Sequence, residues 1–209
     1  FTEAGELVPP AGHGEEDILR EARRQAVIPV LVLTPLGADG RFNNNLVAVL
    51  VRDLEIQQKL IRELWTVVQE KGYGEVDVDF EYVLAEDREL YADFVRRLRI
   101  IMNLFGIRVT VALAPKTSRE QRGLLYEGID YRALGEAANG VLLMTYEWGY
   151  TYGPPMAVAP INMVRRVVEY ALTEIPAEKI SLGIPNYGYD WPLPYEQGVT
   201  KARSLGYRE

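Results

Sequence analysis

The sequence predicts an α/β fold in which parallel strands alternate with helices. Short apolar runs are separated by longer amphipathic stretches, and proline or glycine stops several of them. The runs are apolar almost throughout, whereas a sheet with one wet face would alternate apolar and polar residues. Repeated βα units form either a barrel or an open doubly wound sheet. No Gly-rich phosphate loop follows a strand, which disfavours a nucleotide-binding open sheet.

The individual elements follow from the apolar periodicity. The expected strands are 27–33, 76–81, 108–113, 141–146 and 180–184, and the expected helices are 15–25, 45–70, 87–104, 131–138 and 161–175. Pro115 and Pro185 end two of the strands, and Gly72 and Gly106 end two of the helices. The stretch 192–209 is rich in proline and glycine and then weakly helical, so we expect it to begin an insertion or a loop excursion.

Length and composition limit the possible functions. The chain has 209 residues, 48% of them hydrophobic, and we expect one domain over 1–209. Its net charge is −7 and it has no basic stripe, so we expect no nucleic-acid partner. No apolar run is long enough for a membrane helix, and the acidic segment 1–14 does not resemble a secretory signal.

Cysteine is absent and His13 is the single histidine. This composition excludes disulfides, thiolate nucleophiles and Cys-based zinc sites, and it nearly excludes a triad or a multi-His metal site. We expect His13 to be a solvated loop residue.

The run 76–81 (VDVDFE) alternates apolar and acidic residues. Because strand side chains alternate between faces, the apolar set would face the covering helices, and Asp77, Asp79 and Glu81 would face the other way. In a barrel that second direction is the interior, where crowded acids push their pKa values apart and one can remain a general acid. Glu81 is nearest the carboxyl end of the strand, where barrel active sites lie.

Three other interpretations of this acidic run remain open. It could be a half-exposed antiparallel strand with a wet acidic face, which its parallel-type neighbours disfavour. It could bind a metal through oxygen ligands, although Tyr82 stands where an EF-hand loop needs glycine. It could also be a structural network of ion pairs.

Aromatic and polar residues also gather after the fourth and fifth expected strands, in 144–150 and 186–191. Aromatic faces suit sugar rings, and polar tips suit sugar hydroxyls. For the first segment alone, ordinary core and rim aromatics explain the composition equally well. Patches of the same kind after successive strand ends favour a sugar site.

The acidic run resembles the DxxDxDxE signature on the fourth barrel strand of glycoside hydrolase family 18. Residues 112–115 resemble the family's fifth strand, and 144–147 resemble its sixth-strand M-x-Y-D motif. The wider text is similar to the spore-cortex N-acetylglucosaminidases of endospore-forming bacteria, over 79–83, 112–117, 125–127, 144–160 and 183–191. The resemblance implies a TIM-type (β/α)₈ barrel of which this chain carries about strands three to seven.

The same resemblance implies roles for individual residues. Glu81 would be the acid and then the base, Asp79 would bind the acetamido N–H, Asp77 would share a proton with Asp79, and Tyr146 would hold the acetamido group. The implied substrate-binding residues are Met144, Glu147, Trp148, Asn186, Tyr187 and Trp191. The substrate's own N-acetyl group would be the nucleophile, so neither a metal nor a cofactor is expected.

The implied function is retaining hydrolysis of β-1,4 N-acetylglucosaminyl bonds in peptidoglycan, in the spore cortex or coat or in the cell wall. The alternatives are a chitinase-like hydrolase and a non-catalytic glycan-binding module on the same fold.

Some features depart from the family pattern. Gly74 and Glu75 stand where the signature has Asp and Gly, and Glu147 stands where many chitinases carry Asp. The first, second and eighth strands are expected to be missing from this stretch. We therefore expect unpaired barrel edges that favour self-association, and little or no activity from the stretch alone.

Overall fold

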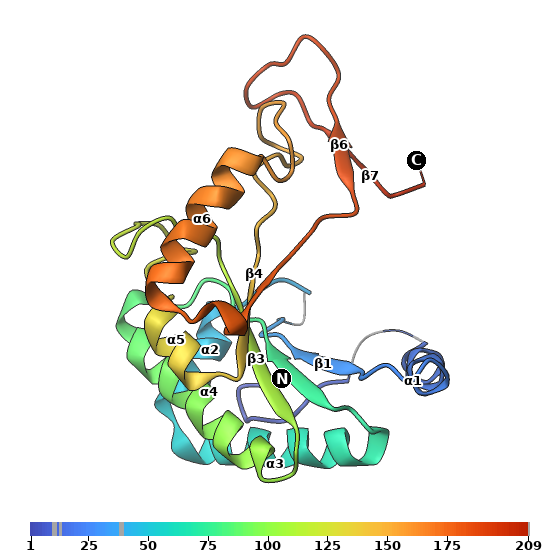
Figure 1. Ribbon diagram of the computed structural model, residues 1–209, viewed down its shortest axis with the longest axis vertical. Coiled ribbons are helices and arrows are strands. Elements are labelled where there is room, and N and C mark those ends of the chain that lie inside the picture. Colours follow the sequence, from blue (N-terminus) through green and yellow to red (C-terminus); the bar gives the residue numbers. More distant parts are fainter. Residues whose placement is uncertain (10–11, 13, 38–39, 209) are drawn as a thin grey trace.

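The structure is a computed structural model that describes residues 1–9, 12, 14–37 and 40–208. His13, predicted to lie in a solvated loop, falls outside the described residues. Five parallel strands form one sheet, and most of the helices form a layer against it (Figure 1). None of the helices in the described part of the chain combines the length and the apolar character needed to cross a bilayer.

The elements have the following bounds. The strands are β1 (Val30–Leu33), β2 (Glu75–Val78), β3 (Arg108–Leu113), β4 (Gly140–Leu143), β5 (Ile180–Leu182), β6 (Gly188–Asp190) and β7 (Arg203–Leu205). The helices are α1 (Glu15–Arg24), α2 (Asn44–Arg52), α3 (Leu54–Lys71), α4 (Arg88–Asn103), α5 (Tyr131–Ala137) and α6 (Ile161–Glu174). Two short 3₁₀ helices are η1 (Ala85–Asp87) and η2 (Ala177–Lys179).

The sheet order distinguishes the two predicted architectures. The strands follow chain order, β1-β2-β3-β4-β5, and every neighbouring pair is parallel. A doubly wound sheet would reverse its strand order at a switch point and carry helices on both faces. Sequential order with α2 to α6 gathered on one side is the arrangement of a (β/α) barrel wall (Figure 1). The predicted α/β barrel fold is confirmed, and the antiparallel interpretation of 76–81 is wrong.

The core lies between the sheet and its helical layer. Val76 and Val78 of β2 are fully buried, as are Val109 and Val111 of β3. Phe80 continues this apolar face beyond the end of β2. It stacks on Tyr91 and Phe94 of α4, with ring centroids 5.4 Å and 5.9 Å apart. Each aromatic contact of this kind adds about 1 kcal/mol to the burial of the rings. The packing fixes which face of the 76–81 run meets the helices.

The two outer strands are exposed. Val32 of β1 is 55% exposed and Leu182 of β5 is 42% exposed, although apolar residues inside a parallel sheet are normally covered. Among the described residues, no further strand pairs with the outer side of β1 or of β5. The sheet is therefore an open part of a barrel, as predicted.

The helix predicted over 45–70 is wrong in one respect, because the chain breaks it in two at Asp53. This residue is extended, with φ −122° and ψ 114°, and its carboxylate accepts hydrogen bonds from the backbone N–H groups of Glu55 and Ile56. Aspartate is a strong N-cap, so a second helix starts here. Apolar periodicity alone does not reveal the break, since apolar residues recur through both helices.

The strands are shorter than predicted, and the final segment differs in kind. Predicted strands 27–33, 76–81, 141–146 and 180–184 are regular only over β1, β2, β4 and β5. The excess residues 79–81 and 144–146, which follow β2 and β4, belong to the loops that hold the site described below. The weak helix expected within 192–209 is absent from the described residues of that segment. Instead β7 pairs antiparallel with β6, because backbone pairing with a nearby strand outweighs a weak local helix propensity.

Candidate active site

The three predicted acids lie together along β2 and its continuation. Asp77 is 8% exposed, and Asp79 and Glu81 are half-buried. The Asp79 N–H donates to the carbonyl of Leu33, so the residue still follows the line of the strand. Because Phe80 is fixed beneath α4, Asp79 and Glu81 are turned to the face of the sheet away from the helices. Tyr82 then leaves this line with a positive φ of 58°.

Burial and mutual repulsion disfavour ionisation of these acids. The pKa of Asp79 is raised to about 6, first by burial and then by the charge of Asp77. Burial, followed by the charges of Asp79 and Glu147, raises the pKa of Glu81. The pKa of Asp77 is raised by burial, which outweighs the opposing hydrogen bond from Thr110. The site thus favours protonated carboxyl groups, as general acid catalysis requires.

Asp79 has an unused acceptor. Its Oδ1 atom is buried and has no hydrogen-bond partner among the described residues. An unpaired buried carboxylate oxygen costs roughly 1–3 kcal/mol, so it is an unfavourable feature of the isolated protein. It is suited to accept an N–H group from a bound molecule.

We predict that Asp79→Asn stabilises the fold above acidic pH. The Asp79 pKa is raised to about 6, so folding favours its protonated form, and stability is lost as pH rises from roughly 4 through 6. Asparagine does not ionise, so the variant does not lose stability over this pH range. Its free energy of unfolding at pH 7 should exceed that of the wild type by about 1 kcal/mol after allowance for partial exposure. Urea unfolding at pH 4.5 and pH 7, with exposed Asp190→Asn as the control, measures the difference. Equal pH dependence in the wild type and in Asp79→Asn would contradict the shift.

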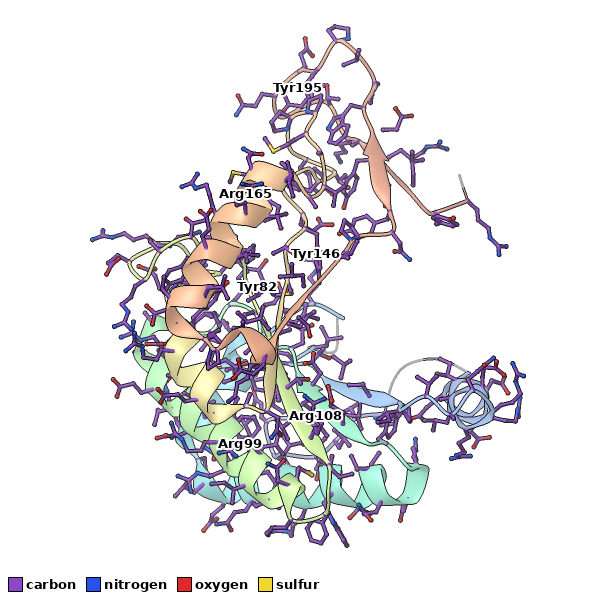
Figure 2. All side chains as sticks on the ribbon, viewed as in Figure 1. Tyr82, Arg99, Arg108, Tyr146, Arg165 and Tyr195 are labelled. Carbon is purple, nitrogen blue, oxygen red and sulfur yellow. The ribbon has the colours of Figure 1, made fainter. Side chains whose placement is uncertain are left out.

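Tyr146 lies near the same acids, although its strand is separated from β2 by β3. It follows β4, and its pKa is raised by burial and then by the charges of Asp79 and Glu81. Its ring packs against Gly183, where an added Cβ would lie only 2.4 Å from Tyr146 Cε1. Thr145 donates to the Gly183 carbonyl at 2.9 Å, which ties the two segments together. Figure 2 shows Tyr146 beyond the end of β4 and Arg108 at the opposite end of the sheet.

A second polar cluster lies beside the acids. Glu147, with a positive φ of 66°, accepts hydrogen bonds from the hydroxyls of Tyr187 and Tyr189, the latter at 3.0 Å. Trp191 packs near Tyr189 and donates its indole N–H to the Gly153 carbonyl at 2.8 Å. Glu147, Tyr187 and Trp191 are thus brought together by loops after β4 and β5. The prediction omitted Tyr189, although its spacing two residues from both aromatic neighbours is a usable signal.

The other predicted binding residues are more dispersed. Met144 is half-buried directly after β4, and its N–H donates to the Leu113 carbonyl. Trp148 packs against the hydrophobic core, and Asn186 is exposed on the segment that leads into β6. The binding roles of these three residues stay predictions.

Sequence reasoning missed Thr110 of β3. Its hydroxyl lies 2.6 Å from Asp77 Oδ1. The usable signal was one polar residue inside the apolar run 108–113. Within the described part of the chain, no three His, Cys, Asp or Glu side chains are arranged to hold a metal ion, so the metal interpretation gains no support from the geometry.

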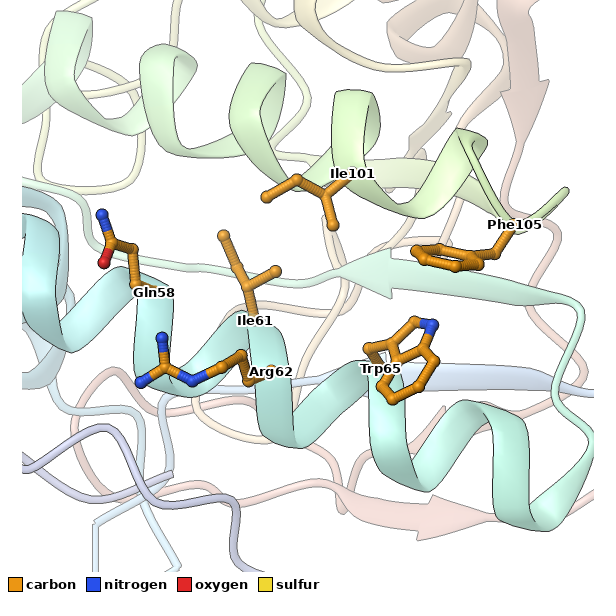
Figure 3. Close-up of a pocket in the computed structure, with 6 residues that line it drawn as sticks. All are labelled: Gln58, Ile61, Arg62, Trp65, Ile101 and Phe105. Carbon is orange, nitrogen blue, oxygen red and sulfur yellow. The ribbon is translucent and has the colours of Figure 1, made fainter.

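An apolar pocket of about 360 Å³ lies elsewhere, on the outer surface between α3 and α4. Figure 3 shows the six residues that line it, Gln58, Ile61, Arg62, Trp65, Ile101 and Phe105. None of them belongs to the strands or loops that carry the acids, so the pocket is separate from this site.

Comparison with known proteins supports the assignment of the motifs. The family model described as "Glycosyl hydrolases family 18" matches residues 32–208. The cortical fragment-lytic enzyme of Bacillus subtilis (strain 168) is 48% identical over 164 residues, covering 78% of this chain and 38% of that protein. The chain spans about two fifths of the length of the curated relatives it matches, such as 42% of the Bacillus cereus cortical fragment-lytic enzyme.

Solved structures agree with this comparison. The Bacillus cereus spore cortex-lytic enzyme SleL matches with a TM-score of 0.92 and 37% identity, over 98% of this chain and 46% of that one. A chitinase from Chromobacterium violaceum matches with a TM-score of 0.89 over 99% of this chain and 63% of that one, and at 23% identity it shows the fold alone. Because the family model covers most of the chain, including Asp77, Asp79, Glu81 and Tyr146, this protein belongs to glycosyl hydrolase family 18.

Proposed function

We propose that this chain carries the catalytic centre of a retaining hydrolase of β-1,4 N-acetylglucosaminyl bonds in spore-cortex peptidoglycan. The observation that carries the proposal is the arrangement of Asp77, Asp79 and Glu81 along one line, with Tyr146 facing them. Asp79 Oδ1 is buried and unpaired, ready for an N–H donor. An acetamido group supplies both that N–H and a carbonyl oxygen.

Glu81 starts the reaction as the acid. Its raised pKa keeps a population of the neutral carboxyl that can donate a proton to the leaving glycosidic oxygen. As that C–O bond breaks, the acetamido carbonyl oxygen of the same sugar bonds to the anomeric carbon. The substrate therefore supplies the nucleophile, and no enzyme carboxylate needs to reach the carbon.

Asp79 and Tyr146 hold the acetamido group during this step. Asp79 accepts its N–H and balances the positive charge that develops on the oxazolinium ring, while Tyr146 contacts the group from the other side. Glu81, now ionised, takes a proton from water, and the water oxygen replaces the acetamido oxygen at the anomeric carbon. Two successive inversions retain the configuration.

The substrate and its location are inferred from relatives whose names refer to cortex lysis. Glu147, Tyr187 and Trp191 would line the sugar-binding surface, with Met144, Trp148 and Asn186 nearby. The expected place of action is the spore cortex or coat, or the cell wall.

A comparison of two substrates tests the proposal. Purified cortex fragments and chitin oligosaccharides are each incubated with the 209-residue chain and with the full-length gene product, and released reducing sugar is measured. Faster release from cortex fragments supports the proposal. Preference for chitin would establish the chitinase-like alternative, and binding without release by both proteins would establish a glycan-binding module.

We predict that Gly183→Ala lowers kcat by roughly 10-fold or more, because small displacements of positioning groups are costly. The added methyl would lie 2.4 Å from the Tyr146 ring and 3.2 Å from the Leu143 carbonyl, so the ring must move. Gly188→Ala is the matched control, since a Cβ there meets nothing within 4 Å. Equal activities of the two variants would show that the position of Tyr146 is unimportant.

We also propose that the isolated chain self-associates through the exposed edges of its sheet. Edge strands present unpaired backbone groups that pair readily with a second copy. Light scattering should show dimers or larger species, and Val32→Lys on β1 should reduce them. Ile100→Lys on exposed α4 is the control for added charge. A monomer at high concentration would contradict this proposal.

A further inference from the structure

The hydroxyl of Thr110 lies between two carboxylates on the inner face of the sheet. Thr110 of β3 is in register with Asp77 of β2, and its Oγ1 is 2.6 Å from Asp77 Oδ1 and 3.1 Å from Glu75 Oε1. A hydroxyl has one proton, so it donates fully to only one of these oxygens at a time. The shorter distance is that of a charge-assisted hydrogen bond, which indicates that Asp77 is the main acceptor.

Glu75 is the second carboxylate, and it has its own counter-charge. It lies two residues before Asp77, hence on the same face of β2, and it is in register with Arg108. Arg108 Nη1 is 3.3 Å from Glu75 Oε2, with exposed fractions of 61% for the Arg108 side chain and 17% for that of Glu75. This ion pair lies two residues before the Thr110–Asp77 hydrogen bond, toward the amino ends of β2 and β3.

We propose that Thr110 is a positioning residue that holds Asp77 Oδ1, so that the proton shared by Asp77 and Asp79 resides on the other oxygen of Asp77 or on Asp79. The role of that proton rests on the proposed function. Thr110 favours the state in which Asp77 is ionised and Asp79 is protonated, because it stabilises only the carboxylate of Asp77. Glu75 disfavours this ionised state of Asp77, because it competes for the hydroxyl proton of Thr110 and repels a negative charge on Asp77.

Three further titratable groups interact electrostatically with the two aspartates, and burial disfavours ionisation of the two that are tyrosines. Tyr91 of α4 is fully buried and its pKa is well above the ordinary value, first from burial and then from the charges of the two aspartates. The pKa of Tyr146 is raised in the same way. Glu81 is the third group, and it repels Asp79. Shifts caused by changes at Thr110 and Glu75 can therefore be separated from tyrosine ionisation.

The first test follows the carboxyl ¹³C signals of Asp77 and Asp79 by NMR across pH in the 209-residue chain. In Thr110→Val the apparent pKa of the two aspartates should rise by about one pH unit. Valine has nearly the shape of threonine but has no hydroxyl, so the Asp77 carboxylate loses its hydrogen-bond donor. Thr110→Ser should restore the wild-type titration, and Thr66→Val on exposed α3 should leave it unchanged. A folded Thr110→Val protein with wild-type titration would overturn the proposal.

The second test uses Glu75→Gln and predicts the opposite sign. The apparent pKa of the pair should fall, since a nearby negative charge is removed and the amide no longer competes as an acceptor at that position. Exposed Glu70→Gln on α3 removes the same charge at the solvent-exposed surface of the helix and should change nothing. Shifts of the same sign in Thr110→Val and Glu75→Gln would also overturn the proposal, because general destabilisation would then explain both.

The titrations need no turnover, so they separate this inference from the proposed function. If Glu81→Gln remains active in the full-length gene product, the proposed function fails, whereas the NMR result for Thr110 still stands or falls by itself. If Glu81→Gln is inactive, the pH profile of kcat in Thr110→Val should shift with the NMR titration. A shift in titration without any change in the kcat profile would refute the link between Thr110 and catalysis.

Discussion

Replacing Glu81 with glutamine is expected to lower kcat on cortex fragments by roughly 10²- to 10⁴-fold while the protein stays folded. Glutamine has nearly the same shape as glutamate but has no carboxyl proton to give to the leaving oxygen. The half-buried position of Glu81 at the end of the acidic line means that water replaces this proton poorly. Rates of the full-length gene product, with circular dichroism to verify folding, provide the measurement.

The leaving group distinguishes loss of the acid from general damage. A substrate whose leaving group is a weak base, such as a nitrophenol, needs little protonation, so Glu81→Gln should retain much more of its activity on that substrate. Exposed Glu89→Gln on α4 is the control for loss of one charge and should behave as wild type. Turnover of cortex fragments by a folded Glu81→Gln protein at the wild-type rate would remove Glu81 from the mechanism.

Removal of the N-acetyl group from the substrate is expected to lower the rate by roughly 10³-fold or more. The acetamido oxygen is an intramolecular nucleophile, and well-oriented groups of this kind act at effective concentrations of about 10⁵–10⁸ M. The unpaired Oδ1 of Asp79 and the facing ring of Tyr146 would have no group to hold. Parallel assays on acetylated and de-N-acetylated glycans of equal length measure the effect.

A stable mimic of the intermediate provides the matching control. A thiazoline analogue of the oxazolinium ring should inhibit the wild type, and it should bind more weakly to Asp79→Asn, which has lost the charge that balances the ring. Equal cleavage of acetylated and de-N-acetylated glycans would instead indicate that a carboxylate of the protein attacks the sugar.

Local pattern was enough to predict the fold class and the acidic line. Continuous apolar strands separated by helices require a covered parallel sheet, and the alternation in 76–81 requires the acids to face away from Phe80. These conclusions depend on strand periodicity, which is contained in a few consecutive residues. The resemblance to the family signature then indicated roles for Asp79, Glu81 and Tyr146, whose catalytic roles stay predictions.

Tertiary structure alone decided which distant residues support the acids. The contact of Thr110 with Asp77 depends on the register between two strands separated by a helix, and no local pattern specifies that register. The approach of Gly183 to Tyr146 and the two tyrosine hydroxyls on Glu147 depend in the same way on loops that follow different strands. The break at Asp53 and the pairing of β6 with β7 arise from competition between hydrogen-bonding partners. Such competition is settled by the whole packed chain, because each backbone group takes the best partner that the fold brings near.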